Sequence, residues 1–418
     1  MALSQIERDP RRLSQVDFDY AALSKAPDPE GEGIPAGDAA DRLIVDLAAA
    51  TIRKSSTGTV VTVGDRYGAL TLASMSLGAR GVRVCQDSIT SQIALDSNAD
   101  RLFLEAPKTE LRESRGGTGP TFHFVELGPS AFSEAKVVLL RLPRDLAVLA
   151  QWVRLIAAHA APDVRVFAGG RIKHMTTSMN EVISEAFERV DVSLARQKAR
   201  VLIASQPRAD LWVGFGDEGP TVDEAYDDDL GLWVCSSAGV FAPGRVDIGT
   251  RFLLPFLVDE SNLRADGDIS QALLAADLGS GTGILGAALL KEHPEYRLVA
   301  SDRSRAAVRS TEATLRKNLG DDRRFEVVLD HGLSKQKDSS LDLVICNPPF
   351  HSDTAVAESI AVPLFRDAAR ALKPGGVMLT VFNSHLPHRR ALGRIVGPTT
   401  QLGRNPKFTV TKSVKRTR

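Results

Sequence analysis

Cysteine is scarce in this sequence, and its pattern excludes two kinds of stabilising framework. The 418 residues contain three cysteines, Cys85, Cys235 and Cys346, which lie far apart and are odd in number. Disulfide-bonded scaffolds and zinc-binding modules place their cysteines in pairs at short spacing. We therefore expect three reduced thiols, with neither a disulfide nor a metal site.

Long apolar runs and an excess of one charge are also absent. No stretch approaches the roughly 20 apolar residues that span a bilayer, and residues 1–12 carry charges without the apolar segment of a signal peptide. These features predict a cytoplasmic protein that does not bind a membrane. The 52 lysines and arginines balance 52 aspartates and glutamates, so any surface that binds a polyanion must be local.

What the sequence does contain is a regular alternation of apolar strands and helices in two long stretches. Segments such as 59–63 and 135–142 are uniformly apolar or nearly so, and helical segments such as 146–159 separate them. This alternation predicts parallel sheets that are covered by helices on both faces. The predicted divisions are an N-terminal segment (1–37), a first domain (38–205), a linker rich in proline, glycine and acid (206–231) and a second domain (232–418).

One stretch of the second domain combines a buried strand with an abrupt stop. Residues 341–346 predict the strand, and Asn347-Pro348-Pro349-Phe350 follows directly. Proline lacks a backbone N–H and fixes φ, so the strand must end at the edge where open α/β sheets bind ligands. The Asn347 side-chain oxygen and the Pro348 carbonyl can accept both hydrogens of an amine, while Phe350 can stack on a planar group. The loop therefore suits chemistry at a delocalised amine or amide nitrogen, and a rigid proline turn is the structural alternative.

A glycine run earlier in this domain fits two kinds of cofactor site. Residues 281–286 match the G-x-G-x-x-G pattern of dinucleotide-binding domains. The frame that begins at Asp277 and contains Gly279, Gly281 and Gly283 instead matches the glycine loop of class I methyltransferases. In both cases glycine permits positive φ and lets backbone amides approach a ligand closely.

The residues after the glycine run separate these two alternatives. The next two predicted strands end in acids, Asp302 and Asp330, which can accept hydrogen bonds from ribose hydroxyls and from an adenine amino group. A dehydrogenase has no use for Asn-Pro-Pro-Phe after the following strand, so the order favours a methyltransferase. Each acid also has a structural alternative: Asp277 can bond to the glycine loop, Asp302 can begin a helix, and Asp330 can form a turn.

The sequence resembles the bacterial ribosomal RNA guanine-N2 methyltransferases of the small- and large-subunit type, which are class I S-adenosylmethionine-dependent enzymes. Four segments carry the resemblance: 240–254, 347–351, 383–385 and 405–410. The sequence departs from the family pattern in the glycine loop, where Ser280-Gly-Thr282 replaces the more usual Cys-Gly-Asn. Small polar residues remain there, so cofactor binding is still expected.

The resemblance implies a fold, an activity and a site. The fold is α/β, with two doubly wound, Rossmann-like methyltransferase domains, of which the N-terminal one is degenerate and the C-terminal one has the class I methyltransferase sheet. The activity is transfer of a methyl group from S-adenosyl-L-methionine to the exocyclic N2 of a guanine in ribosomal RNA, with Asn347 and Pro348 orienting the amine and Phe350 stacking. The residues implied to hold the cofactor are Asp277, Gly279, Gly281, Gly283, Asp302 and Asp330.

The first domain repeats the plan of the second without its chemistry. Residues 64–68 (GDRYG) stand in place of the glycine loop, and residues 141–144 (RLPR) stand in place of Asn-Pro-Pro-Phe. In the resembled family the N-terminal copy is proposed to help hold RNA. The residues here that could contact phosphate are Arg141, Arg144, Arg171 and Lys173.

Basic residues are concentrated at the end of the chain. No acidic residue follows Asp367, whereas the basic residues after it are Arg370, Lys373, Arg389, Arg390, Arg394, Arg404, Lys407, Lys412, Lys415, Arg416 and Arg418. A basic stripe next to the catalytic loop suits ribosomal RNA or a ribosomal subunit as the partner of a monomeric enzyme, with the target guanine flipped or single-stranded. A solvated face is the structural alternative.

Two rival functions remain open from the sequence. Methylation of a glutamine amide in a translation factor can use a similar loop, although a tyrosine at position 350 is more usual there. A catalytically silent RNA-binding assembly factor can keep the fold. Binding of S-adenosylmethionine separates the silent scaffold from both enzymes.

Overall fold

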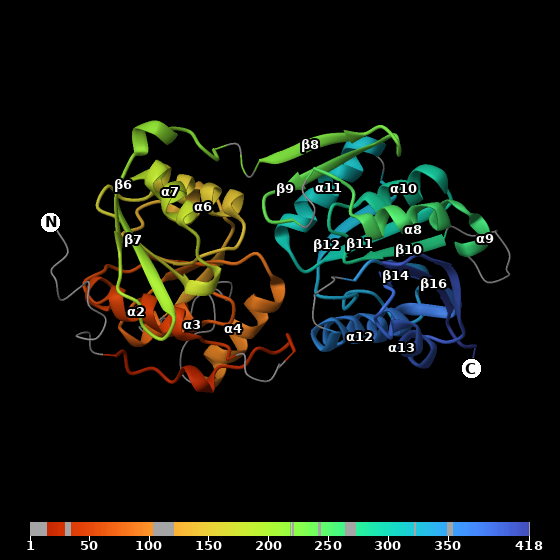
Figure 1. Ribbon diagram of the computed structural model, residues 1–418, viewed down its shortest axis with the longest axis horizontal. Coiled ribbons are helices and arrows are strands. Elements are labelled where there is room, and N and C mark those ends of the chain that lie inside the picture. Colours follow the sequence, from red (N-terminus) through yellow and green to blue (C-terminus); the bar gives the residue numbers. More distant parts are fainter. Residues whose placement is uncertain are drawn as a thin grey trace. The chain divides into compact units, whose positions relative to one another are not determined.

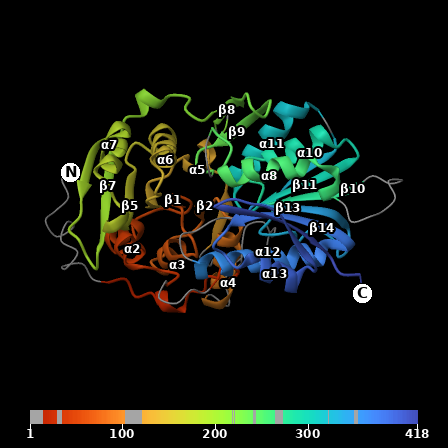
Figure 2. The ribbon, with the colours of Figure 1, turned by 45° about the vertical axis from the view of Figure 1, so that its right-hand side comes forward.

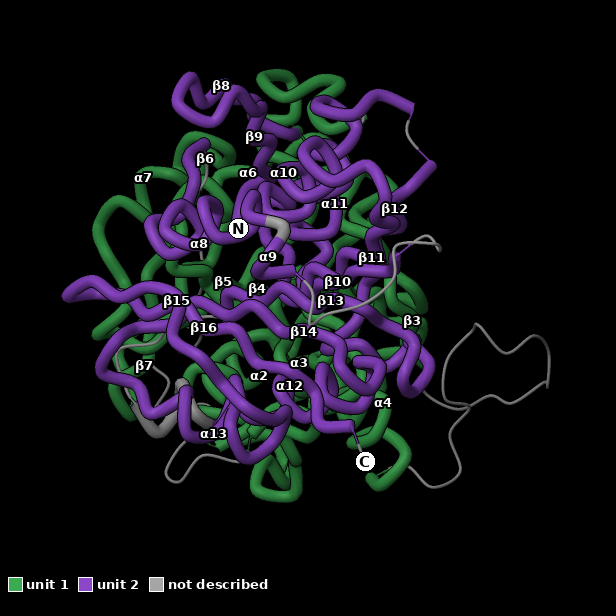
Figure 3. The backbone as a smooth tube through the Cα atoms, turned by 90° about the vertical axis from the view of Figure 1, so that its right-hand side faces the viewer, with its two compact units in different colours: residues 1–221 green, residues 222–418 purple. Residues whose placement is uncertain are grey.

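The chain forms two compact units, residues 1–221 and 222–418, which are coloured separately in Figure 3. The computed structural model describes residues 15–29, 35–102, 121–217, 219, 221–240, 244–263, 273–321, 323–348 and 354–417. The boundary between the units falls inside the stretch 206–231 that was predicted as a linker. Within this stretch, the acid-rich segment Val222–Asp227 forms a strand of the second unit.

The first unit is built on a seven-stranded sheet with the order β3-β2-β1-β4-β5-β7-β6. Strands β1 to β5 run parallel, and β7 is antiparallel to both β5 and β6. The strands are β1 (Val60–Val63), β2 (Val82–Cys85), β3 (Phe122–Val125), β4 (Val137–Arg141), β5 (Arg165–Arg171), β6 (Phe187–Val192) and β7 (Ala199–Pro207).

Helices cover both faces of this sheet (Figure 1). The helices are α2 (Ala39–Ile52), α3 (Ala69–Ser76), α4 (Ile89–Leu102), α5 (Pro129–Phe132), α6 (Leu146–His159) and α7 (Thr177–Ala186), with 3-10 turns η1 (Tyr20–Ala22), η2 (Ile172–His174) and η3 (Ala209–Trp212). Helices α2, α3 and α4 share one core with Val60, whereas α5, α6 and α7 share the other with Val61. Because successive strand residues point to opposite faces, burial of both explains why the strands are apolar throughout.

The second unit repeats this plan with the strand order β12-β11-β10-β13-β14-β16-β15. Strands β10 to β14 are parallel, and β16 is antiparallel to both β14 and β15. The strands are β10 (Leu273–Leu278), β11 (Tyr296–Asp302), β12 (Phe325–Leu329), β13 (Leu341–Cys346), β14 (Leu372–Asn383), β15 (Thr399–Arg404) and β16 (Phe408–Val414).

Two groups of helices cover this second sheet, as Figure 2 shows from another side. The helices are α8 (Ile248–Val258), α9 (Glu260–Leu263), α10 (Ile284–Glu292), α11 (Arg305–Leu319), α12 (Thr354–Ala371) and α13 (His388–Ile395). Leu253 of α8, Leu289 of α10 and Leu315 of α11 pack into one core, whereas Phe365 of α12 and Leu392 of α13 pack into the other. The predicted α/β fold with two doubly wound, Rossmann-like units is therefore confirmed.

A two-stranded hairpin, β8 (Val222–Asp227) with β9 (Leu232–Ser237), begins the second unit. The backbone N–H groups of its second strand bond to side chains of α11, with Trp233 donating to Asn318 at 2.8 Å and Cys235 donating to Thr314 at 2.9 Å. These side chains satisfy backbone donors that have no neighbouring strand. The hairpin is thus fastened to α11 of the second unit.

The sequence analysis missed one strand in each seven-stranded sheet, and it also missed the hairpin β8–β9, whose first strand lies in the predicted linker. Strands β6 and β15 are both edge strands with many half-exposed or exposed positions. An edge strand carries charged and polar side chains, so it lacks the apolar run by which the inner strands were recognised. With their antiparallel partners β7 and β16, these strands make both sheets mixed, where the sequence had predicted parallel ones.

The three cysteines are buried free thiols, as predicted. Within the described part of the chain, no helix has the length and apolar character needed to cross a membrane. Nor do the described residues include a cluster of three or more histidine, cysteine or acidic side chains that could hold a metal ion.

The two units match closely at the centre of each sheet. A glycine with positive φ begins the helix after the first strand in both, Gly68 (φ 90°) and Gly283 (φ 76°). The last residue of that strand pairs with Leu140 in the first unit and with Cys346 in the second. Arg141 of the first unit and Asn347 of the second therefore occupy equivalent positions.

Arg141 is bound into the first unit by two carboxylates. Its guanidinium donates to both oxygens of Asp38 at 2.7 and 2.6 Å and to Asp41 at 2.8 Å. Asp38 and Asp41 also form a capping box at the start of α2. Burial raises the pKa of Asp38, but the hydrogen bonds and charge of Arg141 outweigh it and lower that pKa to about 2. Burial raises the pKa of Asp41 to about 6.

Replacing Arg141 by methionine is expected to lower the free energy of unfolding by about 3 kcal/mol, because two partly buried carboxylates lose their counter-ion. Without Arg141 both carboxylates have raised pKa values and the folded state binds more protons than the unfolded state. The loss should therefore be largest at pH 7–8 and shrink as the pH falls toward 5. Urea unfolding of the full-length chain at both pH values measures it.

The matched control is Arg144→Met, which removes an exposed arginine from the same loop. It should change the free energy of unfolding by less than about 0.5 kcal/mol at either pH. Equal effects of the two substitutions would contradict the structural role of Arg141.

Candidate active site

The predicted site residues of the second unit meet at one edge of its sheet. Strand β10 ends at Leu278, which pairs with Ser301 of β11 and with Cys346 of β13. Because these strands are parallel, the residues that follow them emerge side by side at the carboxyl edge. Gly279, Asp302 and Asn347 are thereby brought together from distant parts of the sequence.

The glycine loop leaves open space where a ligand would lie. Gly279, Gly281 and Gly283 have φ values of 76°, 57° and 76°, a region that favours glycine. A Cβ atom added at Gly279 or Gly281 would meet nothing within 4 Å, whereas one at Gly283 would lie 2.8 Å from the Cα atom of Thr311. The first two glycines thus face open space, and the third allows α10 to pack closely on α11.

Side-chain contacts from Thr311 and Asp302 hold this loop in shape. The hydroxyl of Thr311 donates to the Gly281 carbonyl at 3.1 Å and lies 2.9 Å from the Ser280 hydroxyl. The Gly281 N–H donates to Oδ2 of Asp302 at 3.0 Å. Sequence reasoning missed Thr311, which stands in mid-helix with no motif around it.

Asp302 links the glycine loop to the next helix. While Oδ2 accepts from Gly281, Oδ1 accepts from the N–H of Ser304 at 2.9 Å. The side chain is only half-buried, and a carboxylate has further lone pairs for a second donor on each oxygen. Its place at the end of β11 leaves it able to bind a ribose diol.

Asp277 lies deeper than the other acids. It is fully buried, and its Oδ2 accepts from the N–H of Gly286 in the first turn of α10 at 3.1 Å. Its Oδ1 is buried without a hydrogen-bond partner among the described residues. Burial raises its pKa to about 7, with the charge of Asp302 adding to the shift. This geometry matches the structural alternative of a carboxylate that bonds to the glycine-loop segment.

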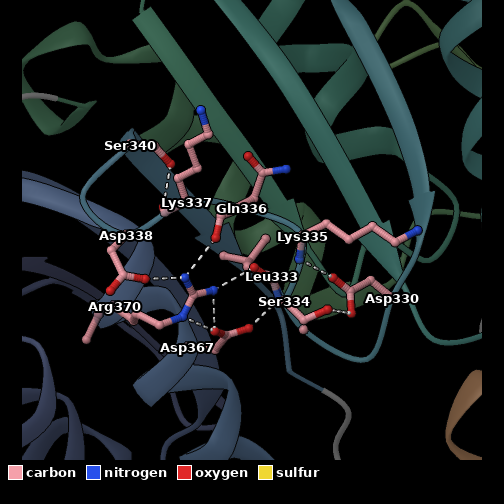
Figure 4. Close-up of polar contacts among 12 residues, drawn as sticks. Asp330, Leu333, Ser334, Lys335, Gln336, Lys337, Asp338, Ser340, Asp367 and Arg370 are labelled. Atoms are coloured by element: carbon pink, nitrogen blue, oxygen red, sulfur yellow. Dashed lines mark hydrogen bonds and ion pairs between the residues drawn. The ribbon is translucent and has the colours of Figure 1, made fainter. Parts of the chain in front are cut away.

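Asp330 is held inside its own turn (Figure 4). Its oxygens accept from the Ser334 hydroxyl at 2.9 Å and the Lys335 N–H at 3.3 Å. Burial raises its pKa, but the bonds from His331, Ser334 and Lys335 outweigh that effect and hold the pKa well below its usual range. The carboxylate thus stays charged and remains an acceptor at the end of β12.

Asn347 directly follows β13, and its side chain is bonded on one side only. Its Nδ2 donates to Oδ2 of Asp247 at 3.0 Å and to the Thr250 hydroxyl at 2.8 Å. Its Oδ1 is buried without a partner among the described residues. A buried acceptor without a donor lowers the stability of the fold by about 1–3 kcal/mol. An unpaired buried acceptor of this kind is expected where a ligand supplies the missing hydrogen bond.

Of the remaining residues of this loop, the structure describes only Pro348. Pro348 is buried. Pro349, Phe350 and His351 lie outside the described residues, so the predicted stacking of Phe350 has no structural description. Asp247 and Thr250 belong to the segment 240–254 that carried the family resemblance, but the sequence analysis assigned them no role. An aspartate directly before a helix, in the N-cap position, was the available signal.

The basic residues of the C-terminal stretch fall into two groups: some bond within the fold and others are exposed. Only the exposed group can belong to the predicted basic stripe, which is a correction to that prediction. Figure 4 shows that Arg370 bonds to Asp367, to Asp338 and to the carbonyls of Gln336 and Leu333. The other basic side chains with structural partners are Lys373 on Asp342, Lys412 on Ser261, Lys415 on the carbonyls that end α12, and Arg416 on Gly393. These groups stabilise the fold instead of facing a ligand.

The other five basic residues of this stretch that the structure describes are exposed, and among the described residues none of the five has an ion pair. They are Arg389, Arg390, Arg394, Arg404 and Lys407. Strand β14 extends to Asn383, beyond the Thr380 that pairs with Cys346, so α13 begins at the same edge as the loop that follows β13. The positive charge next to the site is thus concentrated on and around α13.

In the first unit the equivalent of the glycine loop is closed. A Cβ atom at Gly64 would lie 3.3 Å from Trp152 and 3.4 Å from Arg141. Tyr67 of the same loop donates to Asp28, and the Tyr67 carbonyl accepts from Asn98. Unlike the second unit, this one fills the loop's surroundings with its own chain.

Basic groups nevertheless gather at the carboxyl edge of the first sheet. His174 follows β5, and its pKa is lowered by slight desolvation and by the charges of Arg144, Lys173, Arg141 and Arg171. Arg141 is bound to Asp38 and Asp41, so the prediction that it contacts phosphate is not supported by its contacts. Arg144 and Lys173 are exposed.

Comparison with known proteins agrees with the division of the chain into two units. Residues 231–412 match the family model described as the methyltransferase small domain, and residues 12–209 match the RLMG N-terminal domain. Among solved structures, the T. Thermophilus 16S rRNA N2 G1207 methyltransferase (RsmC), in complex with AdoMet and guanosine, has a TM-score of 0.66 at 18% identity. That similarity covers 88% of this chain and 92% of the RsmC chain, and it shows the same fold.

Relatives of higher sequence identity match nearly the whole length of this chain. Ribosomal RNA large subunit methyltransferase G of Pseudomonas aeruginosa is 32% identical over 413 residues, which are 96% of this chain and 100% of the relative. The protein of the same name from Streptomyces avermitilis is 31% identical, over 94% of this chain and 97% of the relative. The chain therefore belongs to the family of ribosomal RNA large subunit methyltransferase G.

Proposed function

We propose that the second unit transfers a methyl group from S-adenosylmethionine to the exocyclic N2 amine of a guanine in large-subunit ribosomal RNA. The observation that carries this proposal is the buried Oδ1 of Asn347, an acceptor that has no partner among the described residues and follows a strand beside the open glycine loop. The names of the family members support large-subunit ribosomal RNA as the substrate, and the name of the RsmC neighbour, a 16S rRNA enzyme, supports methylation of a guanine N2 with AdoMet. A ribosomal RNA substrate would be met in the cytoplasm.

The residues that are present fit the cofactor. Gly279 and Gly281 offer backbone without side chains, and Asp302 is placed to accept from the ribose hydroxyls. Asp330, charged at the end of β12, is assigned to the adenine amino group. Asp277 is assigned to the support of the glycine loop through Gly286. S-adenosylmethionine supplies an electrophilic methyl group when it is bound.

The catalytic loop acts on the amine of the substrate. The lone pair of a guanine N2 is delocalised into the ring, so the amine is a poor nucleophile. Acceptance of its two hydrogens by Asn347 Oδ1 and the Pro348 carbonyl draws that lone pair toward tetrahedral geometry and fixes its direction. Phe350 is assigned to stack on the base. No strong base is needed, because the proton can leave after transfer.

We assign RNA binding to exposed basic groups in both units. In the catalytic unit these lie on and around α13, and in the N-terminal unit they are Arg144 and Lys173, next to the half-buried Arg171. Such groups bind phosphate without reading sequence.

The substrate is tested by mass spectrometry of ribosomal RNA nucleosides from cells that lack the protein. We expect one N2-methylguanosine of the large subunit to be lost and to return with the wild-type gene but not with Asn347→Ala, which should lower the rate about 100-fold or more. An unchanged nucleoside profile would refute the proposal.

Isothermal titration with S-adenosylmethionine tests the assignment of Asp302. Asp302→Ala should weaken binding about tenfold or more, because a charged acceptor for the ribose hydroxyls is lost. Asp229→Ala, which removes an acid whose side chain is 86% exposed, is the control and should leave the affinity unchanged. Equal affinities of all three proteins would remove Asp302 from the cofactor site.

Salt-dependent binding to ribosomal RNA tests the role of α13. The variant Arg389→Ala/Arg390→Ala should weaken binding and reduce the slope of log affinity against log salt by about 1.5, because each phosphate contact contributes about 0.7–0.9. Arg297→Ala, an exposed arginine at the amino end of β11, should leave the slope unchanged. A slope unaffected by the double substitution would exclude this helix from the RNA surface.

A further inference from the structure

The start of α8 lies against the catalytic asparagine. Both hydrogen bonds of the Asn347 amide nitrogen go to this helix end, to Asp247 at 3.0 Å and to Thr250 at 2.8 Å. Thr250 is buried, with 7% of its surface exposed, and Asp247 is half-buried. The contact is therefore a packed one between segments that are 100 residues apart in sequence.

Asp247 is itself held in place by the helix. It is the N-cap of α8, and the same oxygen that faces Asn347, Oδ2, accepts from the N–H groups of Gly249 at 3.0 Å and Thr250 at 3.1 Å. An N-cap side chain held by two backbone donors has little rotational freedom. The position of this carboxylate is thus set by the backbone.

A carboxylate can only accept, which decides how the asparagine amide lies. The two ends of an amide have the same shape but opposite hydrogen-bonding character. Since Asp247 offers no hydrogen, only the NH2 group of Asn347 can face it favourably. The Oδ1 atom must then point away, and within the part of the chain that the structure describes it is the atom left without a partner.

The first unit contains the same arrangement with a different outcome. Asp38 is the N-cap of α2, accepts from the Ala40 N–H at 2.7 Å, and binds Arg141, the residue equivalent to Asn347. A guanidinium has five donors and no acceptor. In that unit the contact leaves no acceptor at the strand end, whereas the asparagine of the second unit keeps one.

We infer that Asp247, together with Thr250, is a positioning residue that fixes the amide orientation of Asn347 so that its Oδ1 faces the substrate amine. The inference rests on the proposed function for its consequence. With the amide reversed, Nδ2 would present hydrogens to an amine that also presents hydrogens. The acceptor would be lost although the asparagine remained.

Three substitutions separate positioning from helix capping. Serine is as good an N-cap as aspartate but is too short to reach Asn347, so Asp247→Ser keeps the cap and removes one acceptor. Thr250→Val removes the other at nearly constant shape. Asp247→Asn keeps an oxygen for both tasks and is the conservative variant. Asp145→Ser, at the N-cap of α6 in the first unit, is the matched capping control.

The kinetic test uses methyl transfer from labelled S-adenosylmethionine to ribosomal RNA from cells that lack the protein. Asp247→Ser and Thr250→Val should each lower kcat about tenfold, and their combination about 100-fold, with the KM for S-adenosylmethionine unchanged. Asp247→Asn and Asp145→Ser should retain the wild-type rate.

A double-mutant cycle shows whether Asp247 acts through Asn347. In the Asn347→Ala background, the combined Asp247→Ser/Thr250→Val substitution should have no further effect on the residual rate. The same fractional loss in both backgrounds would mean a general structural role and would overturn the inference. So would a wild-type rate in the combined variant.

Hydrogen exchange of the Asn347 side-chain amide tests its orientation without any methyl transfer. The side-chain amide protons of Asn347 are assigned by NMR of asparagine-labelled protein through their loss in Asn347→Ala. Their exchange with solvent should be slow in the wild type and in Asp247→Asn, and fast in the combined variant. Slow exchange without RNA methylation would sustain the orientation and refute the proposed function, whereas fast exchange in the wild type would refute the orientation itself.

Discussion

The parallel pairing of β10, β11 and β13 is the constraint on which the site depends. Each of these strands ends at the same edge, so residues separated by up to about 70 positions in sequence emerge within one small region. The side chains themselves do little until this edge brings them together. The loops can then differ in chemistry without disturbing the apolar core on either face of the sheet.

The two units show how little must change to make or remove a site on this framework. Both have the same strand order and the same positive-φ glycine at the start of the helix after the first strand. In one unit Gly279 faces open space; in the other Gly64 is packed against Trp152 and Arg141. Arg141 is bound into an ion pair with two acids, so its charge now contributes to stability.

The fold and the position of the site could be predicted because they depend on local patterns. Uniformly apolar strands gave the covered sheets, and Asn347-Pro348 marked the end of β13. The edge strands β6 and β15 could not be found in this way, since their exposed side chains follow no apolar pattern. The roles of Asp247 and Thr311 were also hidden, because each depends on a contact across a long stretch of chain. Likewise, the sequence could not tell that Arg370 and Lys415 are used within the fold.

Arg370 has a consequence for anyone who alters the surface of this protein. The acid-free C-terminal stretch invites engineers to exchange its arginines for lysine or glutamine in order to tune solubility. At Arg370 the planar fork of donors reaches Asp367 of the same helix and, in the turn before β13, the Asp338 carboxylate and two carbonyls. Lysine offers a single point of charge and cannot reproduce that geometry. Replacing Arg370 as if it were an ordinary surface charge would therefore remove the hydrogen bonds that join α12 to the neighbouring turn.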